Sequence, residues 1–512
     1  MSARQLSKTV LIMVLMAVFF SGSVAMAQTA YPLVGHPQGG DRRGTYFDAK
    51  GRPDDKSIPL FKDPKMYIHN LNLIAEVPDV RYGQPQMMTI GDKRFILGGR
   101  EIIDVTDPKK PVVVNRKAPR GQVAYNQNLK KWLIMEPVAG EGRDQDFLQK
   151  AKDWRDHPDL KKTWVGVIFY DMTDPRKPVE ISRWQTTGIG IHSDGIYYDG
   201  GRYAYLRGSP EGTRGQWPFH IYAGILQIID VSDINNIKEI SRWWVPGQMM
   251  DEQKEFEAWP EAGPDWTLGA EWSKDLKYHQ AMLHGPCIVP KRVEDGGTRG
   301  YCSWGAHGFI TLDFSDIMKP KQVGRFDHSP PFDSGIPVHT AYPILERKLV
   351  FINPEDTHQD CGDGFSPPFI IDIRSEAHPV SIATIPLPKP PPEAPYTDFC
   401  YRGHRFGVHN AQEFKAPGEP RADLMAYTWF SGGFHLYDIS NPFQPREIGW
   451  LLPPQGERRG TESVLIEWDR KLIHVFADSG LYVLSSPVLG EPILGPMKPR
   501  RWSAPGLNAA AP

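Results

Sequence analysis

The chain has 512 residues, and its 59 Lys and Arg against 61 Asp and Glu give a formal net charge of −2. This balance does not indicate a surface for a polyanion, so nucleic acid is not expected as a partner. Hydrophobic residues make up 40% of the chain and charged residues 23%, while 48 Gly and 48 Pro indicate many turns. The composition excludes extended disorder and long helical bundles, and it does not indicate a function.

Residues 1–27 have the layout of a secretory signal peptide. Arg4 and Lys8 precede an apolar stretch over residues 10–20, and an Ala-Met-Ala sequence ends at Ala27. The alternative, a membrane anchor, needs about twenty uninterrupted apolar residues, and this stretch is too short. We therefore expect cleavage after Ala27, no membrane span, and a periplasmic or secreted protein.

Export permits disulfide bonds, and the chain has four cysteines, Cys287, Cys302, Cys361 and Cys400. Cys287 and Cys302 flank a turn-like EDGGTRG segment, which favours a bridge between adjacent strands and leaves Cys361 to pair with Cys400. The sequence has no C-x-x-C motif, so a thiolate metal site is not expected.

One pattern recurs along the chain: an apolar strand, an Asp, an apolar residue, a short polar pair and, in most copies, a Pro. Each of six copies is marked by its aspartate, and these are Asp104, Asp171, Asp230, Asp313, Asp372 and Asp438. A seventh, degraded copy around Leu484 lacks the Asp. The aspartates are 59 to 83 residues apart. Since a minimal propeller blade has roughly 40–50 residues, this spacing indicates insertions between strands.

Each copy predicts a small antiparallel sheet. The Asp side chain is suited to hydrogen-bond its own backbone in a tight turn, and a hairpin signal such as Asp199-Gly200-Gly201 lies upstream. Seven four-stranded copies arranged radially protect their own edges, so we expect an all-β, seven-bladed β-propeller rather than the alternative, a β-sandwich. The segment 66–77 resembles an outer strand and is expected to complete the last blade.

The predicted domain organisation places the propeller at residues 66–487, after an N-terminal extension at 28–65 and before a C-terminal tail at 488–512. Two insertions, 140–162 and 251–275, interrupt the rhythm of the strands. Either they cover one face of the disc and shape a pocket, or they are surface loops.

The repeats resemble those of the LVIVD-repeat family of secreted propellers. IIDVTDPKKP and IIDVSD are the copies that carry this resemblance, which covers roughly residues 66 to 487. It implies a seven-bladed propeller. It does not imply one activity, because propellers serve as enzymes, scaffolds and binding platforms.

Four histidines begin the innermost strands of successive predicted blades, and these are His192, His284, His339 and His409. Counting along the other blades places Gln84, Gln122 and Glu462 at the equivalent position. The first strand of each blade lines the central channel, so these side chains are expected to converge at one depth. Four imidazoles there can bind one transition-metal ion, copper or iron first and zinc as an alternative. Any one histidine alone would more often be structural.

This arrangement resembles two groups of propeller enzymes. Carotenoid-cleavage oxygenases hold a ferrous ion on the axis with four histidines and an outer shell of glutamates, which implies Glu462 as an outer partner here. Selenium-binding proteins of the methanethiol oxidase type have histidines implicated in copper binding. His404 lies in a loop just before His409. We take His404 and Glu462 as the candidate catalytic residues.

The first functional hypothesis is a metal-dependent oxidoreductase that acts on dioxygen or another small-molecule substrate. The second is a non-catalytic propeller that binds a protein or glycan partner. The third is a metal-dependent hydrolase or lyase, which would use zinc. The sequence shows no nucleophile elbow, phosphate loop or dinucleotide fingerprint.

Overall fold

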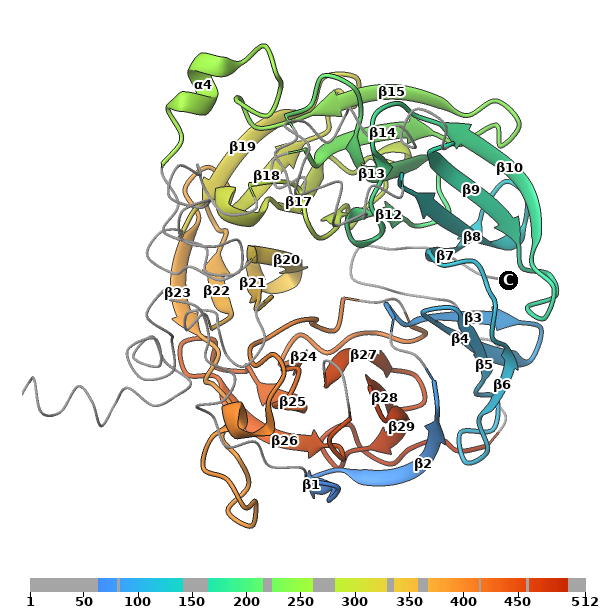
Figure 1. Ribbon diagram of the computed structural model, residues 1–512, viewed down its shortest axis with the longest axis vertical. Coiled ribbons are helices and arrows are strands. Elements are labelled where there is room, and N and C mark those ends of the chain that lie inside the picture. The colour runs from blue at the N-terminus through green and yellow to red at the C-terminus, as the bar shows by residue number, and fades with distance from the viewer. Residues whose placement is uncertain are drawn as a thin grey trace, which may run out of the picture.

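A computed structural model describes nine stretches of the chain, residues 63–80, 83–140, 164–214, 223–260, 281–328, 336–357, 367–413, 416–456 and 460–495. The strands in these stretches form seven antiparallel sheets, arranged like blades around a central axis (Figure 1). The all-β, seven-bladed propeller predicted from the repeats is confirmed. Among the described residues, no helix has the length and apolar character needed to cross a membrane.

The strands of the first three blades run outward from the channel in chain order. Blade one has β3 (Gln86–Ile90), β4 (Lys93–Gly98), β5 (Glu101–Asp104) and β6 (Val112–Asn115). Blade two has β7 (Gln122–Asn126), β8 (Lys131–Val138), β9 (Gly166–Asp171) and β10 (Val179–Gln185). Blade three has a divided inner strand, β11 (Gly190–Ile191) and β12 (Tyr197–Tyr198), then β13 (Tyr203–Ser209), β14 (Ile225–Asp230) and β15 (Lys238–Trp243).

The remaining blades follow the same plan, except that the outer strands of blades six and seven come from the N-terminal segment. Blade four has β16 (Cys287–Ile288), β17 (Arg299–Ser303), β18 (Phe309–Asp313) and β19 (Lys321–Phe326), and blade five has β20 (Ile336–Ile344), β21 (Leu349–Glu355), β22 (Phe369–Asp372) and β23 (Val380–Thr384). Blade six has β24 (Leu424–Thr428), β25 (Phe434–Asp438), β26 (Arg446–Leu452) and β1 (Tyr67–His69), and blade seven has β27 (Thr461–Glu467), β28 (Leu472–Ala477), β29 (Gly480–Ser485) and β2 (Asn72–Pro78).

The N-terminal strands close the ring. β2 pairs antiparallel with β29, with Leu73 opposite Leu484 and Val77 opposite Leu481. This confirms the predicted closure of the last blade. The first part of the same segment behaves differently from the prediction, because β1 pairs with β26 and extends blade six instead.

The repeated aspartates make the turns that the sequence predicts. The Oδ1 atom of Asp104 accepts a hydrogen bond from the backbone N–H of Thr106 at 3.0 Å, and Asp230 accepts one from Ser232 at 2.9 Å. Just before the aspartate of these blades the register to the outer strand shifts by one residue, as between Ile228 and Ile229. Such a bulge increases the local twist, which helps each blade to curve around the axis.

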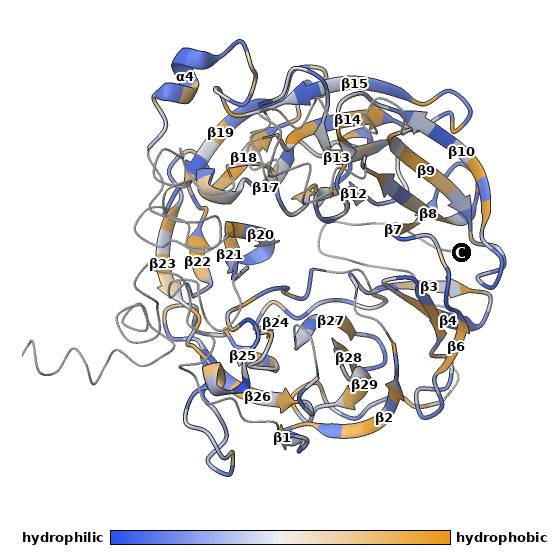
Figure 2. Cartoon of the chain, in the orientation of Figure 1, coloured by the Kyte–Doolittle hydropathy of each residue, from blue (hydrophilic) through white to orange (hydrophobic). Residues whose placement is uncertain are grey.

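The core lies between neighbouring blades rather than at one centre. Middle strands such as β9 and β22 are mostly apolar, whereas α4 (Gln253–Glu257) at the outer edge is mostly hydrophilic (Figure 2). The outer strands carry half-exposed residues, as in β10. Apolar residues on both faces of the middle strands are therefore buried against the two adjacent sheets.

One predicted disulfide is confirmed, since Cys287 is bonded to Cys302 across β16 and β17. Cys400 is also disulfide-bonded, and its predicted partner Cys361 lies outside the described residues. The predicted signal peptide, nearly all of the extension 28–65 and nearly all of the insertion 140–162 also lie outside them. The insertion 251–275 is described as far as residue 260 and contributes α4.

Candidate functional site

The four predicted histidines lie at the inner edges of blades three to six. Main-chain hydrogen bonds to β13, β17 and β24 hold three of these histidines in place. The N–H of His192 donates to the Arg207 carbonyl at 3.0 Å, that of His284 to Ser303 at 3.0 Å, and that of His409 to Thr428 at 2.8 Å. His339 lies within β20 itself. The innermost strands of blades three, four and six are short or interrupted near their histidines.

The imidazole rings form a row that follows the order of the blades. The ring centroids of His192 and His284 are 6.4 Å apart, those of His284 and His339 are 4.8 Å apart, and those of His339 and His409 are 5.1 Å apart. The side chains of His284 and His339 are buried, whereas that of His192 is 39% exposed. His192 is therefore the outlying member of the row.

Glu355 joins the row, although the sequence analysis did not select it. Its Oε2 atom lies 3.6 Å from Nε2 of His339, and its Oε1 atom lies 3.8 Å from Nε2 of His409. One ligand atom each from His284, His339 and Glu355 lie within 4.8 Å of one another. We call these three residues the channel cluster. Donors at these separations can converge on one metal ion after small side-chain adjustments.

The position of Glu355 follows from the hairpin of blade five. β20 and β21 run antiparallel with Ile336 opposite Glu355. The last residue of β21 therefore lies beside the start of β20, close to His339. An acidic residue at the end of the second strand of a hairpin whose first strand carries a histidine was the signal that could have revealed it. Arg405 donates to Oε1 of Glu355 at 2.9 Å and anchors the carboxylate.

Burial keeps two of the imidazoles neutral. Desolvation lowers the pKa of His284 well below its ordinary value, and the positive charge of Arg207 lowers it further. Desolvation lowers the pKa of His339 to about 4, although the Glu355 carboxylate opposes this shift. The Nδ1 atom of His284 has no hydrogen-bond partner within the described stretches. Neutral imidazole is the form that binds metal ions.

His409 has a different environment. Burial opposes its charged form, but Glu355 and Glu462 raise the pKa above its ordinary value. Nδ1 of His409 lies 3.0 Å from the Glu462 carbonyl and 3.2 Å from Oε2 of Glu462, while the ring stacks on Phe430 with centroids 4.6 Å apart. Glu462 thus lies on the Nδ1 side of this ring, and Glu355 lies on the Nε2 side.

His339 is held from behind by a short polar chain. Its Nδ1 atom is 2.8 Å from Oγ1 of Thr340, and that hydroxyl donates to Oε1 of Glu413 at 3.5 Å. Burial raises the pKa of Glu413 to about 8. In the tautomer in which Nδ1–H of His339 donates to this hydroxyl, the lone pair of the ring is on Nε2.

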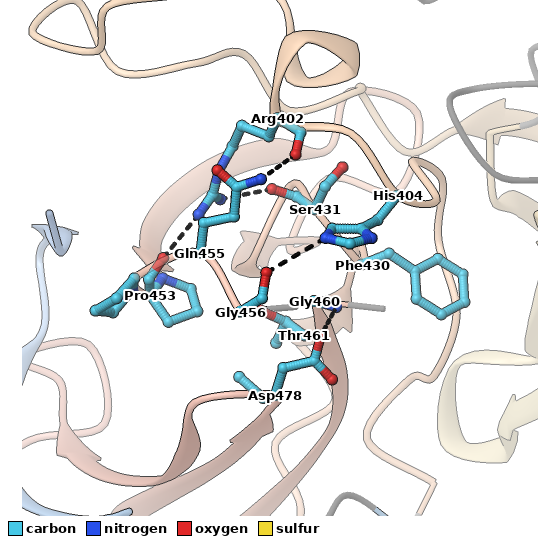
Figure 3. Close-up of a pocket in the computed structure, with 12 residues that line it drawn as sticks. Arg402, His404, Phe430, Ser431, Pro453, Gln455, Gly456, Gly460, Thr461 and Asp478 are labelled. Carbon is cyan, nitrogen blue, oxygen red and sulfur yellow. Dashed lines mark hydrogen bonds between the residues drawn. The ribbon is translucent and has the colours of Figure 1, made fainter. Parts of the chain in front are cut away.

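His404 does not join the row of histidines. It lines a small pocket between blades six and seven, where its Nε2 atom lies 3.3 Å from the Gly456 carbonyl (Figure 3). Phe430 lines the same pocket and stacks on His409, so one aromatic ring separates this pocket from the histidine row. The structure therefore places His404 beside the candidate site and not in it.

Gln122, the glutamine predicted for blade two, links neighbouring blades. Oε1 of Gln122 accepts a hydrogen bond from the Tyr198 N–H of blade three. In blade one, Gln86 and not Gln84 has this role, since its Oε1 accepts from Val123 N–H of blade two at 2.8 Å. These amides are used in the fold and are not offered to a ligand.

The sequence matches no family model and no curated protein, so the LVIVD resemblance stays a prediction. Solved structures with similar folds include a β-propeller domain of Cps50 (Swd1) from Myceliophteria thermophila, with 10% identity, a TM-score of 0.40 and coverage of 81% of this chain and 99% of that chain. Another is a chain of a mitotic checkpoint complex, with 9% identity, a TM-score of 0.40 and coverage of 85% and 94%. Similarities this low carry no argument about function.

Proposed function

We propose that the protein is a metal-dependent oxidoreductase whose channel cluster, His284, His339 and Glu355, holds one transition-metal ion. The observation that carries this proposal is the convergence of two imidazoles and one carboxylate within 4.8 Å of one another. His409 is the adjacent donor, because its Nε2 atom lies 3.8 Å from Glu355.

The donor set favours iron over the other candidate metals. Two histidines and one carboxylate are typical of non-haem Fe(II) sites that keep positions open for dioxygen and substrate. Copper is the second choice, since it also binds imidazole well. When bound, such an ion supplies one-electron and dioxygen chemistry to a small-molecule substrate.

The protein's own groups orient the donors. Nδ1 of His339 lies 2.8 Å from the Thr340 hydroxyl, and Nδ1 of His409 lies 3.0 Å from the Glu462 carbonyl. A neutral ring that donates from Nδ1 to these oxygens has its lone pair on Nε2, the side of Glu355. Arg405 holds the carboxylate. Such outer partners typically change metal affinity by about 10–100-fold when they are removed.

An exported location is part of the same proposal. The Cys287–Cys302 disulfide supports an oxidising compartment, because disulfides persist mainly outside the cytoplasm. Copper and iron are both metals that an imidazole-rich site binds.

The test is metal reconstitution of the purified protein followed by elemental analysis and dioxygen uptake. We expect about one equivalent of iron or copper in the wild-type protein, with at least about a tenfold weaker affinity in His339→Ala and Glu355→Gln. His404→Ala is the matched control, because His404 is a nearby histidine outside the channel cluster, and it should bind metal normally.

Less than about a tenth of an equivalent of any transition metal would overturn the proposal. Unchanged metal content in both His339→Ala and Glu355→Gln would overturn it too. Zinc binding with no dependence on dioxygen would replace the oxidoreductase with a hydrolase or lyase.

A further inference from the structure

Arg207 places a buried guanidinium beside the histidine row. It lies in β13, where its carbonyl accepts the N–H of His192, and its side chain crosses to blade four. There Nη1 donates to the His284 carbonyl at 3.3 Å, and Nη2 lies 3.0 Å from Sδ of Met282. The residue is only 5% exposed. The guanidinium therefore lies between two of the row's four histidines.

This cation has no carboxylate partner. Within the stretches that the structure describes, no Asp or Glu oxygen lies within 4.0 Å of Arg207, and Asp194 and Glu355 influence it only at longer range. Buried Arg94 is paired, with its Nη2 atom 2.7 Å from Oδ2 of Asp469, whereas buried Arg402 donates to the carbonyls of Ser431 and Pro453. A carbonyl and a thioether are weak substitutes, and a buried charge is normally paired.

The chain around Arg207 leaves room for this side chain. A Cβ atom at Gly195 would lie 2.3 Å from Cβ of Arg207 and 2.8 Å from the His284 carbonyl oxygen. A Cβ atom at Gly224 would lie 3.0 Å from Nε of Arg207. Two glycines, one on each side, thus allow the side chain to reach the edge of the channel cluster.

We propose that Arg207 binds the carboxylate of the small-molecule substrate and so selects monoanionic substrates for the channel cluster. The planar guanidinium matches a carboxylate through two parallel N–H donors, and within the described part of the chain each terminal nitrogen makes a single hydrogen bond. A monoanion fits better than a phosphate dianion, because Asp194 and Glu355 already add negative charge nearby. The inference rests on the proposed function in one respect, which is the reaction of the bound substrate at the channel cluster.

The test uses metal-free protein, so that it is independent of the metal proposal. The unfolding temperature is measured with increasing acetate or formate, against chloride at equal ionic strength, and with inorganic phosphate in a separate series. A ligand that binds only the folded state raises this temperature. We expect a saturable rise with acetate in the wild type and none in Arg207→Met.

Two further variants keep the test decisive. Arg207→Lys retains the charge without the planar fork and should bind acetate about tenfold more weakly. Arg183→Met is the matched control, because Arg183 is exposed in β10, pairs with Glu180 and lies over the Trp164 ring, and it should respond like the wild type. If Arg207→Met fails to fold, the comparison of Arg207→Lys with the control decides.

Three results would overturn the inference. They are an acetate response no larger than that to chloride in the wild type, a full acetate response in Arg207→Met or Arg207→Lys, and a stronger response to phosphate than to acetate. Metal content is measured in parallel and should be unchanged in Arg207→Met. Loss of acetate binding with normal metal content therefore separates this inference from the proposed function.

Discussion

Two groups of buried ionisable residues lie at different places in the ring, and they are built in opposite ways. The ring-closure cluster joins blade one to blade seven and contains Arg94, Glu467, Asp469, Arg470 and His474. The row of histidines, with Glu355 and Arg207, lies at the inner edges of blades three to six. Apart from His192, both groups are largely shielded from solvent, so their pairing can be compared directly.

In the ring-closure cluster the charged groups are paired. Both terminal nitrogens of Arg94 donate to Asp469, at 2.8 and 2.7 Å, and Arg94 also donates to Glu467. His474 Nε2 lies 3.0 Å from Oε2 of Glu467. Burial alone would raise the pKa of Glu467, but His474 and the two arginines hold it below its ordinary value.

Near the histidine row the pairing is incomplete. Among the described residues Arg207 has no carboxylate oxygen within 4.0 Å, and burial raises the pKa of Glu413 to about 8 although the charge of His409 opposes this shift. Pairing is what a purely structural buried charge requires. We therefore expect the first cluster to hold the ring closed, and the proposed function assigns ligand binding to the second.

The largest expected effect comes from breaking the ring-closure cluster. Arg94→Met leaves Glu467 and Asp469 buried without their main cation. We expect the free energy of unfolding to fall by about 3–5 kcal/mol, measured by urea denaturation. A loss below about 1 kcal/mol would show that this cluster is no more structural than an exposed pair.

The next effect comes from the disulfide beside the histidine row. Replacing Cys287 and Cys302 together by Ala opens a link that spans 15 residues of sequence. The loop-closure entropy of the unfolded chain predicts a loss of about 3 kcal/mol, measured by denaturant unfolding of the double variant. Amide exchange should quicken in β16 and β17 and remain slow in β27 and β28. Equal quickening in both blades would contradict a local role.

A smaller effect is expected from Glu413. Its pKa is about 8 in the folded protein against an ordinary value of 4.5, so between these values the folded state retains a proton that the unfolded state releases. Wild-type stability should therefore fall as pH rises from about 4.5 to 8. Glu413→Gln should remove this fall and be about 1–2 kcal/mol more stable at pH 8, a discounted figure because the side chain keeps some solvent contact.

Urea denaturation at pH 5 and pH 8 measures this difference between Glu413→Gln and the wild type. Glu467→Gln is the contrasting variant, because the pKa of Glu467 is lowered in the folded protein. The ionised carboxylate therefore stabilises the fold at pH values above the ordinary pKa of a glutamate. This variant should be less stable than the wild type at pH 8. Parallel pH profiles for the two variants would contradict the opposed roles of these carboxyls.

The smallest effect is expected at the surface. Arg183 and Glu180 form an exposed pair with 2.6 Å between Nη2 and Oε1. Arg183→Ala should change the free energy of unfolding by no more than about 0.5 kcal/mol, measured under the same conditions as Arg94→Met. A loss as large as that of Arg94→Met would show that burial does not explain the difference between the two ion pairs.

The fold could be predicted in large part because its signal is local and repeated. An Asp that hydrogen-bonds its own backbone after an apolar strand, as Asp230 does with Ser232, depends on neighbouring residues and recurs in six copies. The division of the N-terminal segment between β1 and β2 could not be predicted. It depends on which of two distant sheet edges each strand meets.

The candidate site could be predicted only in part. His284 and His339 were found because they occupy equivalent positions in successive repeats. Glu355 was missed because it lies at the end of a second strand, and its approach to His339 depends on the register of one hairpin. Arg207 was missed because the case for it depends on how its buried side chain is surrounded in the described structure. A sequence does not show these contacts.

The most direct test of the central claim is a crystal structure of the reconstituted protein with anomalous diffraction at the absorption edge of the bound metal. The account predicts one strong peak in contact with side-chain atoms of His284, His339 and Glu355. A peak elsewhere in the molecule, or none after reconstitution, would contradict it.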